Sequence, residues 1–340
     1  MQARLDIDLG AVRANWRALS RGAPAAAVVK ADAYGLGLAP VARALAAEGA
    51  RSFFVAQVGE GVALRAALGA GPEIFVLSGL MSAADAPAFR ENTLIPCLNA
   101  LPQVADFTSH LGDAPFALQL DTGMNRLGLE AAELEALTLP GTPALVMSHL
   151  ACADERWHPQ NVTQLAAFHA MSAGFAGVRR SLSATGGILL GADFAFDLTR
   201  PGIGLYGGMP FAEARPVVRL SLPVIQVRDV AIGESVGYGA TWRAERPSRI
   251  ATVSAGYADG LPRALSRGAT LWQDDRPCAL AGRVSMDLMS VDVTDLGHDP
   301  DRLDILGPHQ GIDALAEAAG TIGYEILTGL GPRYDRRYAG

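Results

Sequence analysis

Short apolar runs and helical stretches alternate along the first two thirds of the chain. The runs are continuous rather than alternating in polarity, which is typical of strands buried on both faces of a parallel sheet. Between them, segments such as 38–50 and 161–175 carry apolar residues at helical spacing. The eight runs are 25–31, 52–57, 73–79, 92–98, 116–121, 144–150, 180–185 and 197–207.

This repeat of strand and helix predicts the fold of the first part. Eight such units in about 210 residues match a (β/α)8 TIM barrel, which is an α/β fold. An open doubly wound sheet is the alternative. The number of units and the polar residues that follow the predicted strands favour the barrel.

The pattern changes after residue 211, where the strand-like segments become shorter and the turns come closer together. We therefore expect a smaller, mostly β C-terminal domain, in which only 311–320 has clear helical spacing. Prolines 210 and 216 interrupt the pattern, so we predict a barrel at 1–213 and a β-rich domain at 214–340, with the first residues of the chain as candidates to pair with the second domain. The predicted strands of this domain are 220–230, 249–256, 289–296 and 304–307.

Composition adds limits to this picture. The chain has 340 residues, of which 50% are hydrophobic, so it can bury a sizeable core. Its net charge of −7 argues against general nucleic-acid binding. No apolar run is long enough to span a membrane, and the start of the chain lacks the apolar stretch of a signal peptide. We therefore expect a cytoplasmic protein.

Metal, disulfide and dinucleotide sites are not indicated. Cys97, Cys152 and Cys278 form no Cys-x-x-Cys pair and are interpreted as small buried hydrophobic residues. The six histidines lack the His-Glu-x-x-His spacing of a metal site. The segment GLGLAP at 35–40 resembles a dinucleotide fingerprint but ends in Pro40 where glycine or alanine is needed.

A lysine ends the first predicted strand. In TIM barrels the chemistry takes place at the C-terminal ends of the strands, and Lys30 lies at such an end. Burial lowers the pKa of a lysine, and the neutral amine can then form a Schiff base. An ion pair with Asp32, or a lysine that extends its amine to solvent, explains the position equally well.

The loops after the seventh and eighth predicted strands carry hydroxyls and glycines. Barrels often bind phosphate with these two loops, and such groups are suitable donors to a dianion. Glycines that only form turns are the alternative. Combined with Lys30, the loops suggest pyridoxal phosphate. The residues concerned are Ser183, Thr185, Gly186, Gly187, Gly202 and Ile203.

The chain resembles the alanine racemase family along nearly its whole length. The lysine motif is shared with other fold-type III pyridoxal-phosphate enzymes, whereas GYADG and GRVSMD are specific to this family. The motifs follow the family's order: LDIDLGAVRANW (5–16), AVVKADAYGLG (27–37), DTGMNRLG (121–128), MSHLA (147–151), RPGIGLYG (200–207), VGYGATW (236–242), GYADGLPR (256–263) and GRVSMD (282–287).

The resemblance implies an activity and its catalytic residues. Family members interconvert L-alanine and D-alanine by a two-base pyridoxal 5'-phosphate mechanism and supply D-alanine for peptidoglycan biosynthesis. By resemblance, Lys30 holds the cofactor and moves the α-proton on one face, and Tyr257 moves it on the other. The resemblance further implies a head-to-tail homodimer, in which the tyrosine of each subunit serves the lysine of the partner subunit.

The resemblance also implies binding roles. Arg126 and the Met286 amide would bind the substrate carboxylate, and Asp287 would lie near the entrance. Arg200 would hydrogen-bond the pyridine nitrogen, and His149 would link Arg200 toward Tyr257. The cofactor-binding set is Lys30, Tyr34, His149, Ser183, Arg200, Gly202 and Ile203.

Three positions depart from the family's pattern. Many members carry a modified lysine seven residues before the DTGM arginine, where this chain has Gln119. The family's Cys-Met pair is Ser285–Met286 here. Some relatives have a phosphate-binding tyrosine before a C-terminal arginine, where this chain has Pro332, and Tyr334 and Tyr338 are candidates to replace it.

Other functions stay open at this point. A racemase acting on serine or on basic amino acids would share these motifs. A decarboxylase on the same scaffold would not need GYADG. A binding protein that carries the cofactor would need only the barrel, so the second domain argues against it.

Overall fold

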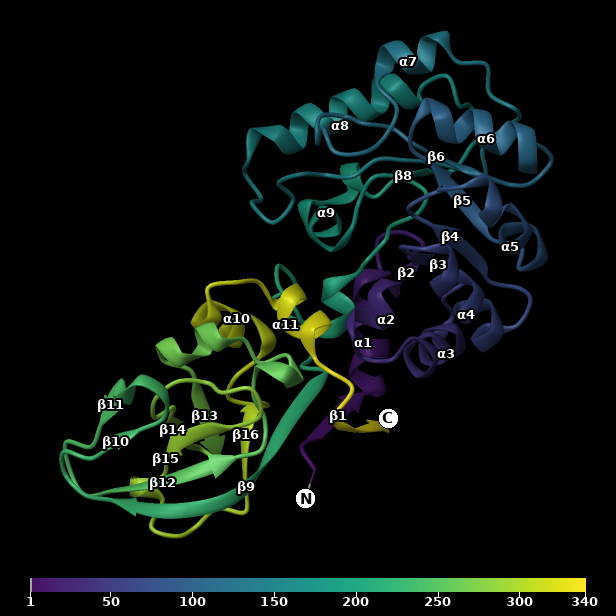
Figure 1. Cartoon of the computed structure of the whole chain (residues 1–340). Helices are drawn as coiled ribbons and strands as arrows, with labels where there is room; N and C mark the ends of the chain where they lie inside the picture. The colour runs from purple at the N-terminus through teal and green to yellow at the C-terminus, as the bar shows by residue number, and fades with distance from the viewer. Residues whose placement is uncertain (1) are drawn as a thin grey trace. The chain divides into compact units, whose positions relative to one another are not determined.

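The computed structural model describes residues 2–340, which form two compact units. Val12–Leu205 and Met209–Ala214 make up one, called here the barrel unit. The residues up to Ala11, Tyr206–Gly208 and Arg215–Gly340 make up the other, called here the β unit. Figure 1 shows the helices and strands of both units.

The barrel unit is built on a parallel sheet whose seven strands follow one another in chain order. Thr199 forms a bridge to Ala25 before the first strand, and Arg200 forms one to Ala184 after the last. These two residues take the place of an eighth strand, so the TIM barrel is confirmed. The strands are β2 (Ala27–Val28), β3 (Ser52–Val55), β4 (Glu73–Val76), β5 (Ile95–Leu98), β6 (Ala117–Gln119), β7 (Leu145–Met147) and β8 (Arg180–Ser181).

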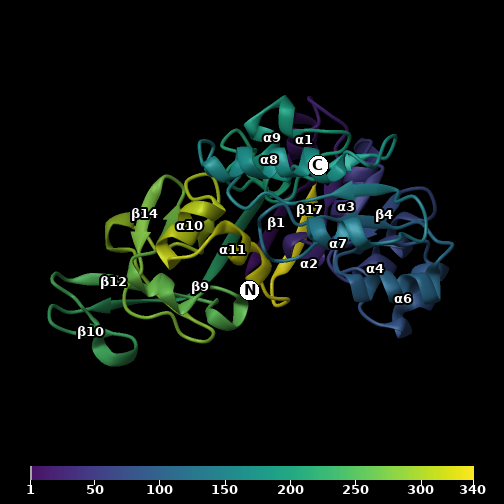
Figure 2. The same ribbon diagram turned by 90° about the horizontal axis from the view of Figure 1, so that it is seen from above.

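Helices connect the strands and lie on their outer side (Figures 1 and 2). The core of the barrel unit includes Phe53, Phe54 and Phe75, all fully buried, and the rings of Phe54 and Phe75 stack with centroids 4.7 Å apart. The helices are α1 (Leu9–Leu19), α3 (Leu38–Glu48), α4 (Val58–Leu68), α5 (Ala86–Glu91), α6 (Leu101–Leu111), α7 (Ala131–Ala136), α8 (Pro159–Ser172) and α9 (Thr185–Leu190).

Two predicted strands differ from the structure at their ends. The first strand ends at Val28, so Lys30 follows β2 instead of ending it. The run at 197–207 has only bridge residues, and Ile203–Tyr206 is a 3-10 helix. Apolar composition alone does not separate a buried strand from a buried turn beside it, which explains both errors.

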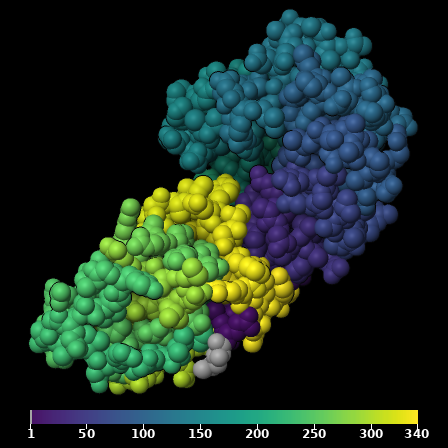
Figure 3. Space-filling view, viewed as in Figure 1, coloured from purple at the N-terminus to yellow at the C-terminus, as the bar shows by residue number. Residues whose placement is uncertain are grey.

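One long strand, β9 (Val218–Val230), organises the β unit. It pairs antiparallel with β1 (Arg4–Asp8), β12 (Ser248–Val253) and β16 (Arg302–Leu306). The first strand also pairs in parallel with the last, β17 (Asp335–Ala339), so these two segments from opposite ends of the chain lie side by side (Figure 3).

The rest of the β unit consists of short strands and two helices. We expected a helix only at 311–320, and α11 corrects this expectation. Its first and last residues are glycines, which are poor helix formers and hide the helix in the sequence. The elements are β10 (Ser235–Val236), β11 (Trp242–Arg243), β13 (Thr270–Gln273), β14 (Arg276–Ala279), β15 (Met289–Asp292), α10 (Ile312–Ala319) and α11 (Gly323–Gly329). Within residues 2–340, every helix is too short or too polar to cross a bilayer.

Gly260 packs directly against the backbone of Gly329 in the β unit. It has φ +89°, and a Cβ atom there would lie 1.8 Å from the Gly329 carbonyl oxygen. Gly233 has a similar φ of +84° but faces open space. At position 260, both the positive φ and the nearby Gly329 carbonyl require glycine. At position 233, only the positive φ does.

We expect Gly260→Ala to lower the free energy of unfolding by about 3 kcal/mol or more, because a backbone carbonyl has to move. Gly233→Ala, with strain alone, should cost about 1 kcal/mol. Urea unfolding of both variants measures the difference. Equal losses would show that the contact with Gly329 is not tight.

Candidate active site

A left-handed turn follows β2 and carries the lysine. The segment α2 (Lys30–Tyr34) has φ between 53° and 56° at residues 31–34, which is the left-handed region. None of these four residues is glycine, and each costs about 1–2 kcal/mol in this conformation. The Ala33 amide donates to the Val29 carbonyl at 2.9 Å and the Gly35 amide to the Ala31 carbonyl at 2.7 Å. Such strain persists where the surrounding structure holds it, and it is common at active sites.

Asp32 does not pair with the lysine. Its Oδ1 accepts a hydrogen bond from the Leu38 amide at 2.6 Å, which closes the loop before α3. Within residues 2–340, no salt bridge joins Lys30 to Asp32. The ion pair considered from the sequence is therefore absent.

Lys30 is partly buried, and its surroundings disfavour its charged form. Burial lowers the pKa of the amine, and the positive charges of Arg126 and Arg200 lower it further, while the Glu60 carboxylate raises it. Lys30 is also the only lysine in the sequence, because the other 27 of the 28 Lys and Arg residues are arginines.

Arg200 is buried among neutral acceptors. Its guanidinium donates to the Ser181 hydroxyl, to the Ser148 carbonyl at 2.5 Å and to the Leu182 carbonyl at 3.3 Å. Its Cζ also lies 5.9 Å from the centroid of the Phe54 ring. Burial lowers the pKa of Arg200 to about 10, so it remains charged near neutral pH.

His149 follows β7 and faces the same cations. Burial, together with the charges of Arg200, Arg126 and Lys30, lowers the pKa of the imidazole to about 3. The ring is therefore neutral over the physiological range. The His149 carbonyl accepts a hydrogen bond from Gln164 Nε2 at 3.0 Å, which ties this segment to α8.

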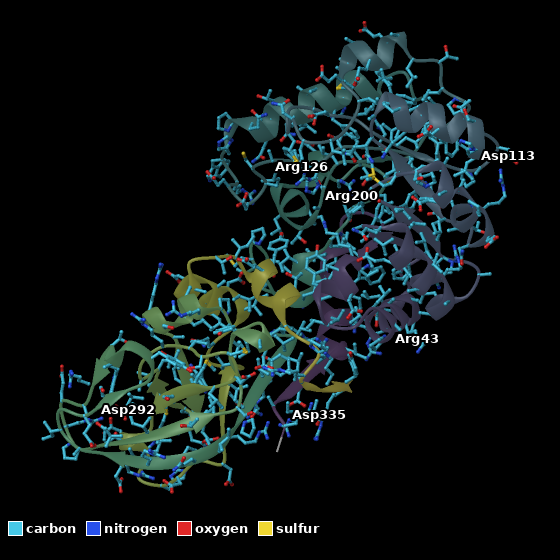
Figure 4. All side chains as sticks on the ribbon, in the orientation of Figure 1. Arg43, Asp113, Arg126, Arg200, Asp292 and Asp335 are labelled. Atoms are coloured by element: carbon cyan, nitrogen blue, oxygen red, sulfur yellow. The ribbon has the colours of Figure 1, made fainter. Side chains whose placement is uncertain are left out.

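A carboxylate shapes the loop that carries Arg126 (Figure 4). Asp121 Oδ1 accepts from the amides of Gly123 at 2.8 Å and Met124 at 2.9 Å, which closes a tight turn after β6. Arg126 is exposed, whereas Gln119 is buried. In residues 2–340, no hydrogen bond joins the side chains of Gln119 and Arg126, so Gln119 does not position this arginine directly.

The predicted phosphate-binding residues come together at the barrel. A Cβ atom at Gly202 would lie 2.3 Å from the Tyr34 hydroxyl, and one at Gly187 would lie 2.5 Å from Ser183 Oγ. Thr185 Oγ1 accepts from the Gly202 amide at 3.1 Å. Ile203, next to Gly202, is buried. The glycines thus allow a close approach to hydroxyl groups, as a phosphate cradle requires.

These residues fit a phosphorylated aldehyde. Among residues 2–340, no carboxylate lies within salt-bridge distance of Lys30, Arg126 or Arg200. A site with excess positive charge, a desolvated amine and a cradle of glycines and hydroxyls suits the anionic phosphate and the carbonyl group of pyridoxal phosphate. Within residues 2–340, no group of His, Cys, Asp and Glu side chains is suited to hold a metal ion.

The remaining predicted residues gather in the β unit. Tyr257 begins a 3-10 turn, Tyr257–Asp259, and its side chain is 44% exposed. The Tyr257 amide donates to the Ser285 carbonyl at 3.0 Å, and the Ala258 amide donates to the Met286 carbonyl at 2.9 Å. The GYADG and GRVSMD segments are therefore joined through their backbones.

A network of charges that the sequence analysis missed lies beside them. Arg333 pairs with Asp259 through two nitrogens, at 2.7 and 2.8 Å, and with Asp287 at 2.7 Å. Asp259 Oδ2 also accepts from the Gly256 amide at 2.9 Å. Arg333, Asp259 and Asp287 line a cavity of about 330 Å³ together with Gln2, Ala3 and Ser254. The aspartates inside GYADG and GRVSMD, Asp259 and Asp287, are the signals in the sequence that pointed to it.

The two tyrosines considered for phosphate binding also belong to the β unit. Tyr334 is buried, its hydroxyl has no hydrogen-bond partner among the described residues, and burial raises its pKa. Tyr338 lies on β17 and is 39% exposed. The barrel unit therefore collects the predicted cofactor residues and Arg126, and the β unit collects Tyr257, Met286 and Asp287.

The two parts of the chain match two family models. The model described as "Alanine racemase, N-terminal domain" matches residues 7–210, and "Alanine racemase, C-terminal domain" matches residues 217–338.

Relatives and solved structures agree with the models. The alanine racemase of Cereibacter sphaeroides is 62% identical over 343 residues, which cover 99% of this chain and 98% of the relative. That of Dinoroseobacter shibae is 59% identical over 345 residues, with the same coverage. The crystal structure of alanine racemase from Bartonella henselae, with covalently bound pyridoxal phosphate, has a TM-score of 0.94 at 38% identity and is covered completely, as is this chain. The biosynthetic alanine racemase from Pseudomonas aeruginosa has a TM-score of 0.92 at 38% identity, covering 100% of this chain and 99% of that one. The chain belongs to the alanine racemase family.

Proposed function

We propose that the chain interconverts L-alanine and D-alanine with Lys30 and Tyr257 as its two bases, and that it supplies D-alanine for peptidoglycan. The observation that carries the proposal is the desolvated amine of the only lysine, placed among cations at a glycine and hydroxyl cradle. Pyridoxal phosphate, when bound, supplies an electron-accepting ring that makes the α-proton of the attached amino acid acidic.

Lys30 and Tyr257 would act on opposite faces of the substrate. Racemisation needs a proton to be removed on one face and returned on the other, so two proton-transferring groups are required. The lowered pKa of Lys30 favours the neutral form of its amine, the form that both cofactor binding and proton acceptance require. The exposed phenol of Tyr257 can reach a substrate without unfolding its turn.

Arg126 and the Met286 amide would hold the substrate carboxylate. Arg126 has no carboxylate partner, and the Met286 amide donates no hydrogen bond within residues 2–340. Both are therefore available to an anion. Two donors on one carboxylate fix the orientation of the α-proton relative to the bases.

Arg200 would control the electronics of the site. Because it stays protonated, Arg200 can only donate a hydrogen bond, so it would leave the pyridine nitrogen of the bound cofactor unprotonated. The cofactor would then be a weaker electron sink, which would disfavour side reactions such as transamination. His149, whose imidazole is kept neutral by burial and by the charge of Arg200, would link Arg200 toward Tyr257.

The proposal includes a head-to-tail homodimer in the cytoplasm. Tyr257 and Met286 are 44% and 54% exposed in a unit separate from the one that holds Lys30, which supports a tyrosine that serves the partner subunit. The three cysteines are free, as is usual in a reducing compartment.

We expect Tyr257→Phe to retain the colour of the lysine-bound cofactor and to lose racemisation of L-alanine by about 10²–10⁴-fold, because a general acid–base group is removed. Absorbance spectra and a coupled assay of D-alanine measure this, and L-serine and L-lysine in the same assay define substrate breadth. Tyr324→Phe, a tyrosine of the same unit with 40% exposure, is the control. Normal turnover in Tyr257→Phe would remove this residue from the mechanism.

Mixing Lys30→Ala and Tyr257→Phe proteins tests whether the sites are shared. Each variant alone should be inactive. If the sites are shared, a randomly exchanged mixture should recover about a quarter of wild-type activity, since half of the dimers are mixed and each has one complete site. A mixture that stays inactive while subunits exchange would place both bases in one subunit.

His149 should remain neutral from pH 8 down to about 5 in the folded, cofactor-free protein, because burial and the neighbouring cations oppose its protonation. The unfolded chain takes up the proton near the ordinary histidine pKa of 6.5, so this residue lowers stability as the pH falls from 6.5 toward 3. Nitrogen-15 NMR of the imidazole, assigned with His149→Gln, checks this. A resonance that titrates near 6.5 in the folded protein would contradict it.

A further inference from the structure

The side chain of Glu60 connects two strand ends of the barrel unit. Glu60 lies in the first turn of α4, which follows β3. Its Oε2 accepts from the amides of Ala56 at 2.7 Å and Gln57 at 3.1 Å. Its Oε1 accepts from the Ala31 amide at 2.6 Å. One carboxylate therefore joins the end of β3 to the residue that follows Lys30.

Capping the helix does not require the second contact. Glu133 occupies the same capping-box position in α7, where its Oε2 accepts from the Glu130 amide at 3.0 Å. In Glu60 one oxygen has this capping role, while the other binds the segment that carries the lysine.

Ala31 is the first left-handed residue of the strained turn, with φ 53°. A hydrogen bond from its amide to a carboxylate is charge-assisted and stronger than one to a neutral acceptor. Because the turn starts directly after Lys30, the place of the amine depends on how firmly Ala31 is held. The Glu60 contact offsets part of the strain at this point.

Glu60 also brings the negative charge that acts on the amine. The cations Arg126 and Arg200 lower the pKa of Lys30, and Glu60 raises it. His149 faces the same cations as a neutral ring. Glu60 thus balances a site whose other charged groups are positive.

We infer that Glu60 is a positioning residue for Lys30, which it holds through the Ala31 amide and by its charge. This inference rests on the proposed role of Lys30 in binding the cofactor. No local sequence pattern indicates this role, because Glu60 is 30 residues away from Lys30 and lies outside the segments that resemble the family.

Glu60→Gln and Glu60→Asp together separate the contribution of the hydrogen bond from that of the charge. An amide offers one acceptor oxygen, and its NH₂ group would face either the Ala31 amide or the amides at the end of β3, which are donors as well. The variant therefore loses one of the two contacts and the negative charge. Glu60→Asp keeps the charge on a shorter side chain, and Glu133→Gln removes an ordinary capping contact in the same unit.

The single lysine makes the test direct. Trace acylation of the cofactor-free protein across pH, followed by mass spectrometry, gives the pKa of Lys30 without competition from other lysines, and the N-terminal amine is on a separate peptide. We expect Glu60→Gln to lower this pKa by about one unit relative to wild type, and Glu60→Asp to restore most of the loss. Glu133→Gln should leave the Lys30 pKa unchanged.

A second measurement reports position. At a pH where the amine is neutral in every protein, capture of pyridoxal phosphate is followed by borohydride reduction and mass spectrometry of the Lys30 peptide. We expect Glu60→Gln to slow this capture about tenfold or more, because the amine is less well oriented. Glu133→Gln, with a comparable loss of stability, should capture at the wild-type rate.

Each outcome decides the inference. If Glu60→Gln and Glu133→Gln lose similar stability and both keep the wild-type Lys30 pKa and capture rate, Glu60 is only a helix cap. If Glu60→Gln does not fold, Glu60→Asp decides: slowed capture with a nearly wild-type pKa supports positioning, and unchanged capture overturns it. If wild-type Lys30 captures no cofactor, the proposed function fails, while the acylation measurement still tests the effect of Glu60.

Discussion

The barrel unit depends on a concentration of positive charge without carboxylate partners. Arg200 is buried against carbonyls, a hydroxyl and an aromatic ring, so nothing neutralises it. Burial is the main reason why the protonated forms of Lys30 and His149 are unfavourable, and the charge of Arg200 adds to this effect at both residues. In the free protein these positive charges have no counterion, which is electrostatically unfavourable. An anionic cofactor with a phosphate group provides the counterion when it binds.

Backbone strain determines the position of Lys30 as much as charge does. A turn of four left-handed residues places the lysine, and such a turn forms only where neighbouring groups hold it. Asp32, Glu60 and the packing of Tyr34 against Gly202 each contribute a contact. In the β unit, Arg333 has a comparable task, because it connects the segment after Tyr257 to the segment after Met286. Both proposed bases are therefore mounted on short segments that are fixed by carboxylate contacts.

Much of this could be predicted from the sequence, and the limits have physical reasons. The eight apolar runs predicted the barrel, because strands that are buried on both faces consist of continuous apolar residues. The same signal could not show that β2 ends before Lys30, since Ala31 and Ala33 are as apolar in a turn as in a strand. Helix α11 was hidden by its terminal glycines. Glu60 and Arg333 were missed because their importance comes from contacts with residues distant in the chain, which no local pattern records.

The restriction of lysine to one position has a chemical consequence for the whole molecule. Aldehydes react reversibly with primary amines, while a guanidinium group remains protonated and is a poor nucleophile. With arginine in place of every other lysine, the surface keeps its positive charges without offering side-chain amines. Excess cofactor, or the open-chain forms of reducing sugars, would therefore find few places to attach outside the site that is built to receive an aldehyde.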